Sequence, residues 1–437
     1  MNREATRALL RSVYDAAVSA AHPAACLPPQ LPEPPKAGRL IVLAAGKAAG
    51  SMAEVAEDFY LARHKFPRER LTGIAVTRPG YTRPTQAVEM IEAGHPVPNQ
   101  AGIDATTRVL DLAASAGTDD LVLVLFSGGA SANWIAPAPG LSLDDKRALT
   151  RELLRSGATI GEINTVRKHL SRIKGGRLAV RAAPARVVTL AISDVPGDDP
   201  SIIGSGPTVS DPSTLAESLD ILARRKIDIP PAIAEALHNP ANETPEPGHP
   251  AFANSVFRIV ARPADALAAA ASAARAAGFV AEVLGTDIEG EARDVAAAHA
   301  EAARRAVKMN RPVLLLSGGE LTVTIRGNGR GGPNQEYALA LAIALDGQKD
   351  IAAISGDTDG TDGGAGSSDD PAGAFVDETT LSRARSLGLD PARFLADNDS
   401  TGFFERLGDL LVPGPTCTNV NDLRAVLVDT RAGAGEK

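Results

Sequence analysis

The chain has 437 residues, of which 44% are hydrophobic and 22% are charged, a composition that is ordinary for a globular protein. This length exceeds what one typical hydrophobic core organises, so two domains are expected. The formal net charge of −8 argues against a general nucleic-acid binder or a membrane-surface protein.

The cysteines and the hydropathy of the chain indicate where in the cell the protein is expected to function. Cys26 and Cys417 fit no metal-binding spacing and no disulfide framework, which indicates a reducing environment. No run of 18 apolar residues occurs, and the first residues, MNREATRALL, lack the apolar segment of a signal peptide. A cytoplasmic protein that binds neither membranes nor nucleic acid is therefore expected.

The first half of the chain alternates strands and helices. Apolar residues at helical spacing predict a helix over 4–21, and the Pro-rich segment 23–35 then excludes regular structure. Buried strands are predicted at 39–45, 71–77, 87–93, 121–126 and 186–192, and helices near 48–60, 103–114, 143–157 and 161–180. This alternation predicts a parallel sheet with helices on both faces.

A domain boundary is predicted within HNPANETPEPGHPAFA, residues 238–253, because this segment holds four prolines and few apolar residues. The expected domains are residues 1–240 and 241–437. Beyond the boundary the alternation resumes, with strands predicted at 255–260, 279–285, 312–316 and 350–355 and helices at 263–278 and 290–309. The fold class is therefore α/β with two domains.

The stretch Leu321–Leu345 combines an expected strand over 321–325, a Gly-rich loop and a helix that begins near Pro333. Such an arrangement holds phosphate in many α/β proteins, because glycine lets the backbone approach and the helix N-terminus offers N–H groups. Three glycines of this loop fit the dinucleotide fingerprint G-x-G-x-x-G: Gly327, Gly329 and Gly332. The loop therefore indicates either a nicotinamide enzyme or another phosphate-handling protein.

Two further loops follow predicted strands in the first domain. Lys47 lies between a strand and a helix, where a mobile positive charge suits a phosphoryl group or a carboxylate. Ser127, Gly128, Gly129, Ala130 and Ser131 form a small-residue loop whose backbone N–H groups can bind an anion. The alternatives are an exposed loop lysine and a simple strand-to-helix turn.

The stretch NTVRKHLSRIKGGR, residues 164–177, is unusually basic for an acidic protein. On a continuous helix, Arg167, Ser171 and Lys174 would share one face. This face is either a solvated surface or an anion-binding surface.

Acidic loops follow two other predicted strands. Asp194 comes after 186–192 and is positioned to bind a metal or to accept a hydroxyl proton. Asp357, Asp359 and Asp362 lie in SGDTDGTDGG and are hard oxygen ligands suited to Mg²⁺, although an Asp/Gly turn cluster is the alternative. In a nicotinamide enzyme, Asp357 would bind the ribose.

The loops are more informative together than singly. They fall at strand ends, where open α/β sheets bind ligands, and they combine lysine, arginine and aspartate. Phosphoryl transfer needs this mixture, because its catalysis rests on positioning and charge neutralisation, whereas hydride transfer needs fewer fixed charges.

These residues resemble the class II glycerate kinases, the glycerate 2-kinase family whose C-terminal module is called MOFRL. The similarity extends over roughly residues 5–430. It rests on the runs AAGKAAGSMA (44–53), GHPVPNQAG (94–102), SGGASA (127–132), INTVRKHLSRIKGG (163–176), SDVPGDDPSIIGSGPT (193–208), SGGE (317–320), GRGGPNQE (329–336), SGDTDGTDG (355–363) and TNVND (418–422).

The resemblance implies ATP- and Mg²⁺-dependent phosphorylation of D-glycerate at its 2-hydroxyl, giving 2-phosphoglycerate and ADP. It implies a Rossmann-like N-terminal domain, a MOFRL-type C-terminal domain and an active site between them. Family members have also been labelled hydroxypyruvate reductases, so an NAD(P)H-dependent reductase is the alternative. A homodimer is the expected assembly.

By analogy, Lys47 and an arginine of the Gly-rich loop, here Arg330, are the expected catalytic cations. Many family members carry an arginine directly before Asn-Gln-Glu, where this chain has Pro333. The acceptor is expected at residues 127–131 with Arg167 and Lys174. ATP is expected to bind at Ser317, Gly318, Gly319, Glu320, Gly329, Gly331 and Asn334. Mg²⁺ is expected to be bound by Asp194, Asp357 and Asp362. Asp194 is also expected to act as the base.

Overall fold

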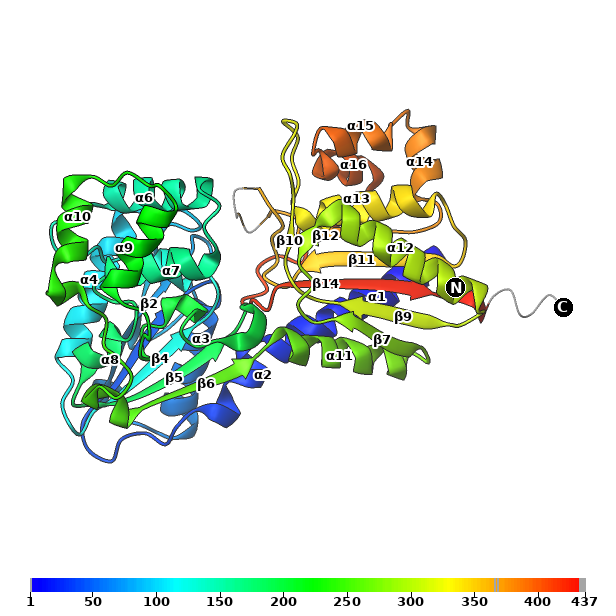
Figure 1. Ribbon diagram of the computed structural model, residues 1–437. Coiled ribbons are helices and arrows are strands. Elements are labelled where there is room, and N and C mark those ends of the chain that lie inside the picture. The colour runs from blue at the N-terminus through cyan, green and yellow to red at the C-terminus, as the bar shows by residue number, and fades with distance from the viewer. Residues whose placement is uncertain (1, 365–366, 368, 432–437) are drawn as a thin grey trace. The chain divides into compact units, whose positions relative to one another are not determined.

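A computed structural model describes residues 2–364, 367 and 369–431 (Figure 1). The chain folds into two compact units. Residues 26–260 make up the N-terminal unit, and residues 1–25 join residues 261–437 in the C-terminal unit. Each unit is mixed α/β, which confirms the predicted fold class.

The two units differ from the expected domains in the position of the boundary and in the assignment of the first 25 residues. The predicted boundary segment does not separate two domains, because it packs against the N-terminal unit: the backbone carbonyl of Asn242 accepts a 2.6 Å hydrogen bond from Arg177, and Glu243 binds His169 at 2.9 Å. The next strand, β6 (Ser255–Ala261), then joins the sheet of that unit.

Helix α1 (Arg3–Ala21) belongs to the C-terminal unit although it begins the chain. It packs against α11 (Pro263–Ala276), and its buried Tyr14 donates a 2.7 Å hydrogen bond to the backbone carbonyl of Asp357. Arg7 binds the buried carboxylate of Asp409 at 2.8 Å. These long-range interactions, rather than chain order, assign the helix to its unit.

The N-terminal unit contains one six-stranded sheet in the order β3-β2-β1-β4-β5-β6. The pairings β1–β2, β1–β4, β2–β3 and β4–β5 are parallel. The strands before β6 are β1 (Leu40–Ala45), β2 (Leu71–Thr77), β3 (Val88–Glu92), β4 (Leu121–Phe126) and β5 (Arg186–Ile192). Every residue of β1 and β4 is buried, as expected for central strands covered on both faces.

The helices of this unit form two groups. α4 (Gln100–Ala114) and α8 (Arg177–Ala182) share a core with one face of the sheet, and α3 (Ala49–Asp58) also packs on the sheet. A separate core lies between α6 (Leu143–Arg155), α7 (Ile160–His169), α9 (Leu215–Arg224) and α10 (Pro231–His238). The short helix α5 (Ala130–Asn133) also belongs to this unit, whereas residues 23–25 of the short helix α2 (Pro23–Cys26) belong to the C-terminal unit.

The predicted helix over 161–180 is wrong, because the chain breaks it into α7 and α8. α7 ends at His169, and Gly175 and Gly176, with left-handed φ values of 58° and 83°, lie directly before α8, so no continuous right-handed helix passes through them. A Cβ atom on Gly176 would lie 2.6 Å from the ring of Phe252. Arg167 and Lys174 therefore do not share a helix face.

The C-terminal unit contains a mixed sheet in the order β13-β12-β11-β14-β9-β7. Within the described part of this sheet, the β7–β9 pairing is parallel and the other pairings are antiparallel. Its strands are β7 (Val280–Gly285), β9 (Val313–Ser317), β11 (Ile351–Asp357), β12 (Gly373–Val376), β13 (Leu410–Leu411) and β14 (Asp422–Val428). β8 (Gly290–Glu291) and β10 (Leu321–Thr322) form a separate two-stranded pair.

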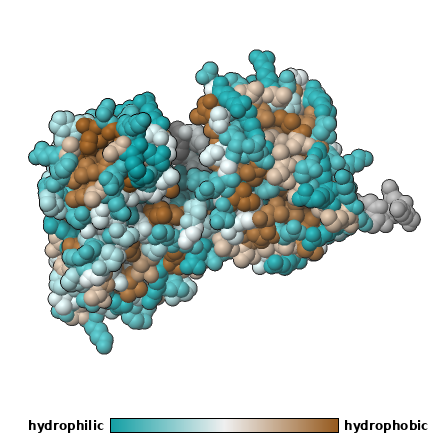
Figure 2. Space-filling view, viewed as in Figure 1, coloured by the Kyte–Doolittle hydropathy of each residue, from teal (hydrophilic) through white to brown (hydrophobic). Residues whose placement is uncertain are grey.

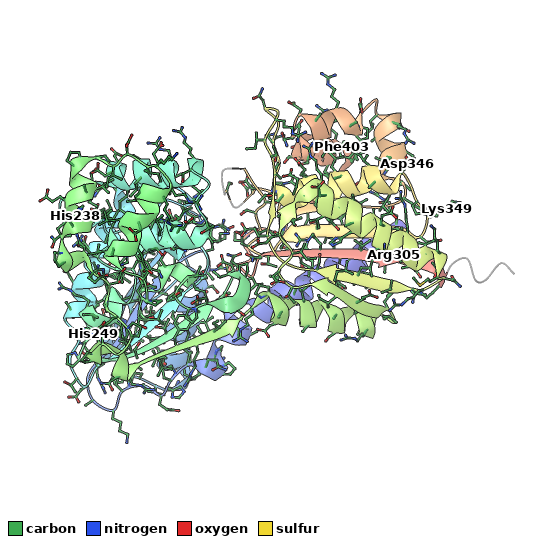
Figure 3. All side chains as sticks on the ribbon, viewed as in Figure 1. His238, His249, Arg305, Asp346, Lys349 and Phe403 are labelled. Carbon is green, nitrogen blue, oxygen red and sulfur yellow. The ribbon has the colours of Figure 1, made fainter. Side chains whose placement is uncertain are left out.

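Helix α13 (Pro333–Leu345) is almost completely buried and packs against α12 (Ala292–Lys308), β11 and β12. α14 (Thr380–Ser386), α15 (Pro391–Ala396) and α16 (Ser400–Leu407) cover it, and Phe403 of α16 is buried among aromatic neighbours (Figures 1 and 3). The helix prediction at Pro333 is confirmed, whereas the strand predicted over 321–325 is wrong beyond Thr322.

The visible surface mixes polar and apolar residues, with brown patches among teal ones over both units (Figure 2). The exposed large apolar residues include Leu154 and Ile160 in the helical group of the N-terminal unit. None of the helices in the described part of the chain combines the length and the apolar character needed to cross a membrane.

Candidate active site

The strand order of the N-terminal unit reverses between β1 and β4, which are adjacent in the sheet. In open α/β sheets ligands bind at such a switch point, outside the carboxyl ends of the strands. Lys47 lies in the loop after β1, and Ser127-Gly128-Gly129 follows β4. The two loops singled out by the sequence therefore meet at the position that the topology favours for a ligand.

Short polar contacts lock these two loops together. The backbone N–H of Lys47 donates to the carbonyl of Gly128 at 2.9 Å, and that of Ala48 donates to the Ser127 hydroxyl at 2.9 Å. Gly46 adopts φ 111°, and a Cβ atom there would lie 2.6 Å from the carbonyl oxygen of Ser127. The buried Ser127 hydroxyl thus fixes the loop that carries Lys47.

Gly129 brings two further side chains to the same place. Its φ is 86°, and a Cβ atom would lie 2.8 Å from Nε2 of His95 and 3.3 Å from Cγ of Lys47. His95 follows β3 and was not predicted as a site residue. The signal was available in GHPVPNQAG, since this loop also follows a strand that ends at the same edge.

Arg78 follows β2 and was also missed by the sequence analysis. It is buried, and its guanidinium carbon lies 3.8 Å from the centre of the Tyr81 ring, a cation–π distance. Consecutive strands of the sheet therefore end at Lys47, Arg78 and His95. The edge is rich in groups that interact with anions.

A second group of cations adjoins the loop after β4. Lys174 is only 1% exposed, and its amine donates to the carbonyl of Ser131 at 3.0 Å. The hydroxyl of Ser131 is 2.7 Å from that of Ser205. Burial, followed by the positive charges of Arg167 and Lys146, holds the pKa of Lys174 well below its usual range. The structure thus brings Arg167 and Lys174 together electrostatically without a shared helix.

Asp194 lies after β5 at the same edge and is half-buried, next to the buried Ser193. Its predicted roles as a base and as a metal ligand stay predictions. Among the described residues no group of three His, Cys, Asp or Glu side chains forms a metal site. Of the predicted metal ligands, Asp194 belongs to the N-terminal unit, whereas Asp357 and Asp362 belong to the C-terminal unit.

In the C-terminal unit, polar residues gather where β9 and β11 end and β14 begins. Ser317 pairs with Arg424, and Asp357 pairs with Asp422, in the sheet register. Arg424 is fully buried and donates to the Ser317 hydroxyl at 3.1 Å and to the Asp422 carboxylate at 3.0 Å. Arg424 was not predicted. It fixes the second Ser-Gly-Gly loop, Ser317–Gly319, whereas Glu320 is exposed.

Backbone N–H groups of the Gly-rich loop are hydrogen-bonded within the C-terminal unit and are not free to bind a ligand. The N–H groups of Gly327, Gly329 and Arg330 donate to Asn398, Asp397 and Asp399 at 3.0, 2.9 and 3.1 Å. Cβ atoms on the loop glycines would lie 2.2–2.5 Å from their neighbours, which are Asp397, Asp399, Ser400 and Asp362. The glycines therefore serve close packing, which removes the physical basis for the dinucleotide fingerprint.

The N-terminus of α13 is already occupied by a carboxylate. Asp362 accepts from the backbone N–H groups of Asn334 and Gln335 at 2.9 and 2.8 Å, and from both side-chain amides. Burial and then the charge of Asp422 raise the pKa of Asp362 to about 7, although these hydrogen bonds lower it. With both oxygens engaged, Asp362 does not fit the predicted Mg²⁺ ligand, and buried Asn334 instead joins Asp362 to Asp422.

Arg330 lies on the surface of the C-terminal unit. Its side chain is 67% exposed and pairs with Glu405 of α16, itself 58% exposed, at 2.9 Å. Such an exposed pair contributes little to stability. A catalytic role for Arg330 stays a prediction. In that role its guanidinium would leave Glu405 and bind a phosphoryl group instead.

Comparisons with known proteins decide the family. Residues 9–238 match the model described as a domain of unknown function, DUF4147, and residues 313–422 match the MOFRL family. The chain belongs to the DUF4147–MOFRL family. It is 40% identical to the D-glycerate 2-kinase of Thermotoga maritima over 390 residues, which cover 88% of this chain and 89% of that protein.

A solved member of the family has the same fold. The crystal structure of a glycerate kinase from Thermotoga maritima matches with a TM-score of 0.85 and 38% identity, covering 98% of this chain and 100% of that one. Another family member, from Agrobacterium vitis, is 47% identical over 433 residues, which cover 98% of this chain and 95% of that protein. It bears the provisional name hydroxypyruvate reductase. Both names expected from the sequence resemblance therefore occur within the family.

The raised pKa of Asp362 predicts an unusual pH dependence of stability. A carboxyl group whose pKa is higher in the folded protein than its ordinary 3.8 stabilises most below that value, and this contribution is lost as the pH rises through about 7. Asp362→Asn should therefore destabilise the protein more at pH 5 than at pH 8, as measured by urea unfolding. A destabilisation that grows with pH would contradict this assignment.

Proposed function

We propose that the protein transfers the γ-phosphoryl group of ATP to the 2-hydroxyl of D-glycerate, giving 2-phosphoglycerate and ADP. The observation that carries this proposal is the contact of Lys47 and Lys174 with one loop at the switch point of an acidic protein, with the charge of Arg167 acting on Lys174. The 40% identity to a named D-glycerate 2-kinase supports it. A cytoplasmic location and a homodimeric assembly stay predictions.

The acceptor is proposed to bind to the N-terminal unit. Its carboxylate requires a positive environment, which Arg167 and Lys174 supply beside Ser131. The 2-hydroxyl then lies towards Lys47, on the other side of the Ser127–Ser131 loop. A buried loop fixed by hydrogen bonds is a suitable surface for this, because positioning supplies much of the rate of phosphoryl transfer.

Lys47 is proposed as the catalytic cation. Its backbone is fixed by Gly128 and its side chain passes Gly129, so the charge is held at the strand end. There it neutralises charge on the γ-phosphoryl oxygens during transfer. Asp194, at the end of β5, is the proposed acceptor of the hydroxyl proton, although a loose transition state does not strictly need a base.

The nucleotide is proposed to bind to the C-terminal unit near Ser317–Glu320, at the edge where β9 and β11 end. Mg²⁺ accompanies nucleotide phosphates with one or two protein carboxylates, and Asp357 or Asp194 fits this modest requirement, whereas Asp362 does not. When bound, the ion would neutralise phosphate charge. The expected location of the active site between two domains stays a prediction.

The alternative, an NAD(P)H-dependent hydroxypyruvate reductase, is favoured only by the names of some family members. The Gly-rich loop that suggested it has its amides bonded to residues 397–399. A pyrophosphate at this loop would compete with those bonds. The kinase is therefore the better-supported function.

One pair of assays separates the two functions. ADP release should depend on D-glycerate and Mg²⁺, and NMR of the product should identify 2-phosphoglycerate. In parallel, NADH and NADPH should not be oxidised with hydroxypyruvate. Nicotinamide oxidation without glycerate-dependent ADP release would overturn the proposal.

Lys47→Ala should lower kcat by roughly 10²-fold or more, a size typical for the loss of one preorganised charge in an active site. The fold should persist, because the loop is held by backbone contacts and by Ser127. Circular dichroism and thermal melting check the fold, and the ADP-release assay checks the rate. A rate close to that of the wild type would remove Lys47 from the mechanism.

Arg330→Ala and Glu405→Ala form a matched pair, because each removes one partner of the same exposed ion pair. If Arg330 assists transfer, its loss should lower kcat about 10²-fold, while Glu405→Ala should leave kcat nearly unchanged. Both variants should melt within a few degrees of the wild type. Unchanged turnover in Arg330→Ala would make the pair purely a surface contact.

A further inference from the structure

Lys146 is a buried lysine that the sequence analysis did not single out. It lies on α6 with 7% exposure, and its amine donates a 2.7 Å hydrogen bond to the carbonyl of Leu170. Leu170 is the residue that follows the last turn of α7. A cation at a helix C-terminus stabilises that end of the helix, so Lys146 fixes the turn that carries Arg167.

The charges around Lys146 are mostly positive. Burial, followed by the positive charges of Arg167 and Arg177, lowers the pKa of Lys146 to about 7. Lys146 in turn lowers the pKa of Lys174, after the larger effects of burial and Arg167. Lys146, Arg167 and Lys174 thus form one cationic cluster from α6, α7 and the segment after α7.

The carboxylates near this cluster have other partners. Asp211 binds Lys168 at 3.2 Å, and Glu243 binds His169 at 2.9 Å. Both carboxylates also act electrostatically on Arg177. Among the described residues, no ion pair reaches Lys146, Arg167 or Lys174, and the two lysine amines donate to backbone carbonyls instead.

Buried positive charges without a counter-ion are costly, and a bound anion removes that cost. The cluster adjoins the Ser131–Ser205 hydroxyl pair through Lys174. A surface that only needed to be solvated would not bury two lysines. The arrangement is therefore suited to an anionic ligand beside the loop after β4.

We propose that Lys146 is a positioning residue of the acceptor's carboxylate subsite, which holds Arg167 in place and restricts the acceptor to hydroxy acids with an ionised carboxylate. This inference rests on the proposed function and deepens it. A neutral polyol of the same size, such as glycerol, lacks the charge that this cluster needs and is excluded as an acceptor.

Binding of the carboxylate is also coupled to protonation. An anion favours the charged forms of Lys146 and Lys174, so its binding takes up protons once the pH exceeds about 7, the value to which the pKa of Lys146 is lowered. The affinity for the hydroxy acid should consequently fall as the pH rises from 7 to 9. A cluster with permanently charged groups alone would show no such fall.

The test compares Lys146→Met and Lys146→Arg with the exposed-lysine control Lys36→Met in the full-length protein. Lys146→Met should raise the KM for D-glycerate about tenfold or more, while kcat and the KM for ATP stay within about twofold. Lys146→Arg should restore most of the affinity, and Lys36→Met should match the wild type. An unchanged KM for glycerate in folded Lys146→Met, or a fall in kcat alone, would overturn the proposal.

A second measurement does not depend on the folding of a variant. Calorimetric titration of wild-type protein with D-glycerate at pH 8, in two buffers of different ionisation enthalpy, should show proton uptake, and the KM for glycerate should rise between pH 7 and 9. Absence of both effects would also overturn the role of Lys146. Failure of the proposed function is distinguishable, because the wild type would then release no ADP with glycerate at any pH.

Discussion

The close approach of the loops after β1 and β4 is the constraint on which the rest of the site depends. Gly46 and Gly129 have positive φ values, and a Cβ atom on Gly46 would overlap Ser127 of the facing loop, whereas one on Gly129 would overlap His95. The Ser127 hydroxyl then joins the two loops through the N–H of Ala48. These loops lie where the strand order reverses, so their packing positions Lys47 at the edge of the sheet where a ligand is expected.

Electrostatics are the reason for proposing an anion site at this edge of a protein that is acidic overall. The nearby carboxylates Asp211 and Glu243 are engaged by Lys168 and His169. Lys146, Arg167 and Lys174 have no carboxylate partner among the described residues, so a bound anion would stabilise the charged forms of the two buried lysines. In the C-terminal unit the reverse holds, because Asp362 and Asp422 are satisfied by α13 and Arg424.

Local sequence patterns predicted the strands well, since fully buried runs such as 40–45 and 121–126 have no other stable arrangement. They also placed Lys47 and Ser127–Ser131 at strand ends. The misjudged features depend on contacts between distant residues. Only the partners Asp397–Asp399 reveal that the Gly-rich loop serves packing, and only the approach of Phe252 shows why a glycine is needed at residue 176, before α8. The sequence of α6 gives no sign that Lys146 is buried, because its amine is bonded to Leu170, at the end of a different helix.

The central claim is that the acceptor's carboxylate binds to the cationic cluster beside the loop after β4. A crystal structure of the protein with D-glycerate tests it most directly. The account predicts that the carboxylate lies within hydrogen-bonding distance of Arg167 or Lys174, with the 2-hydroxyl directed towards Lys47. Glycerate bound elsewhere, with the cluster contacting only water, would contradict it.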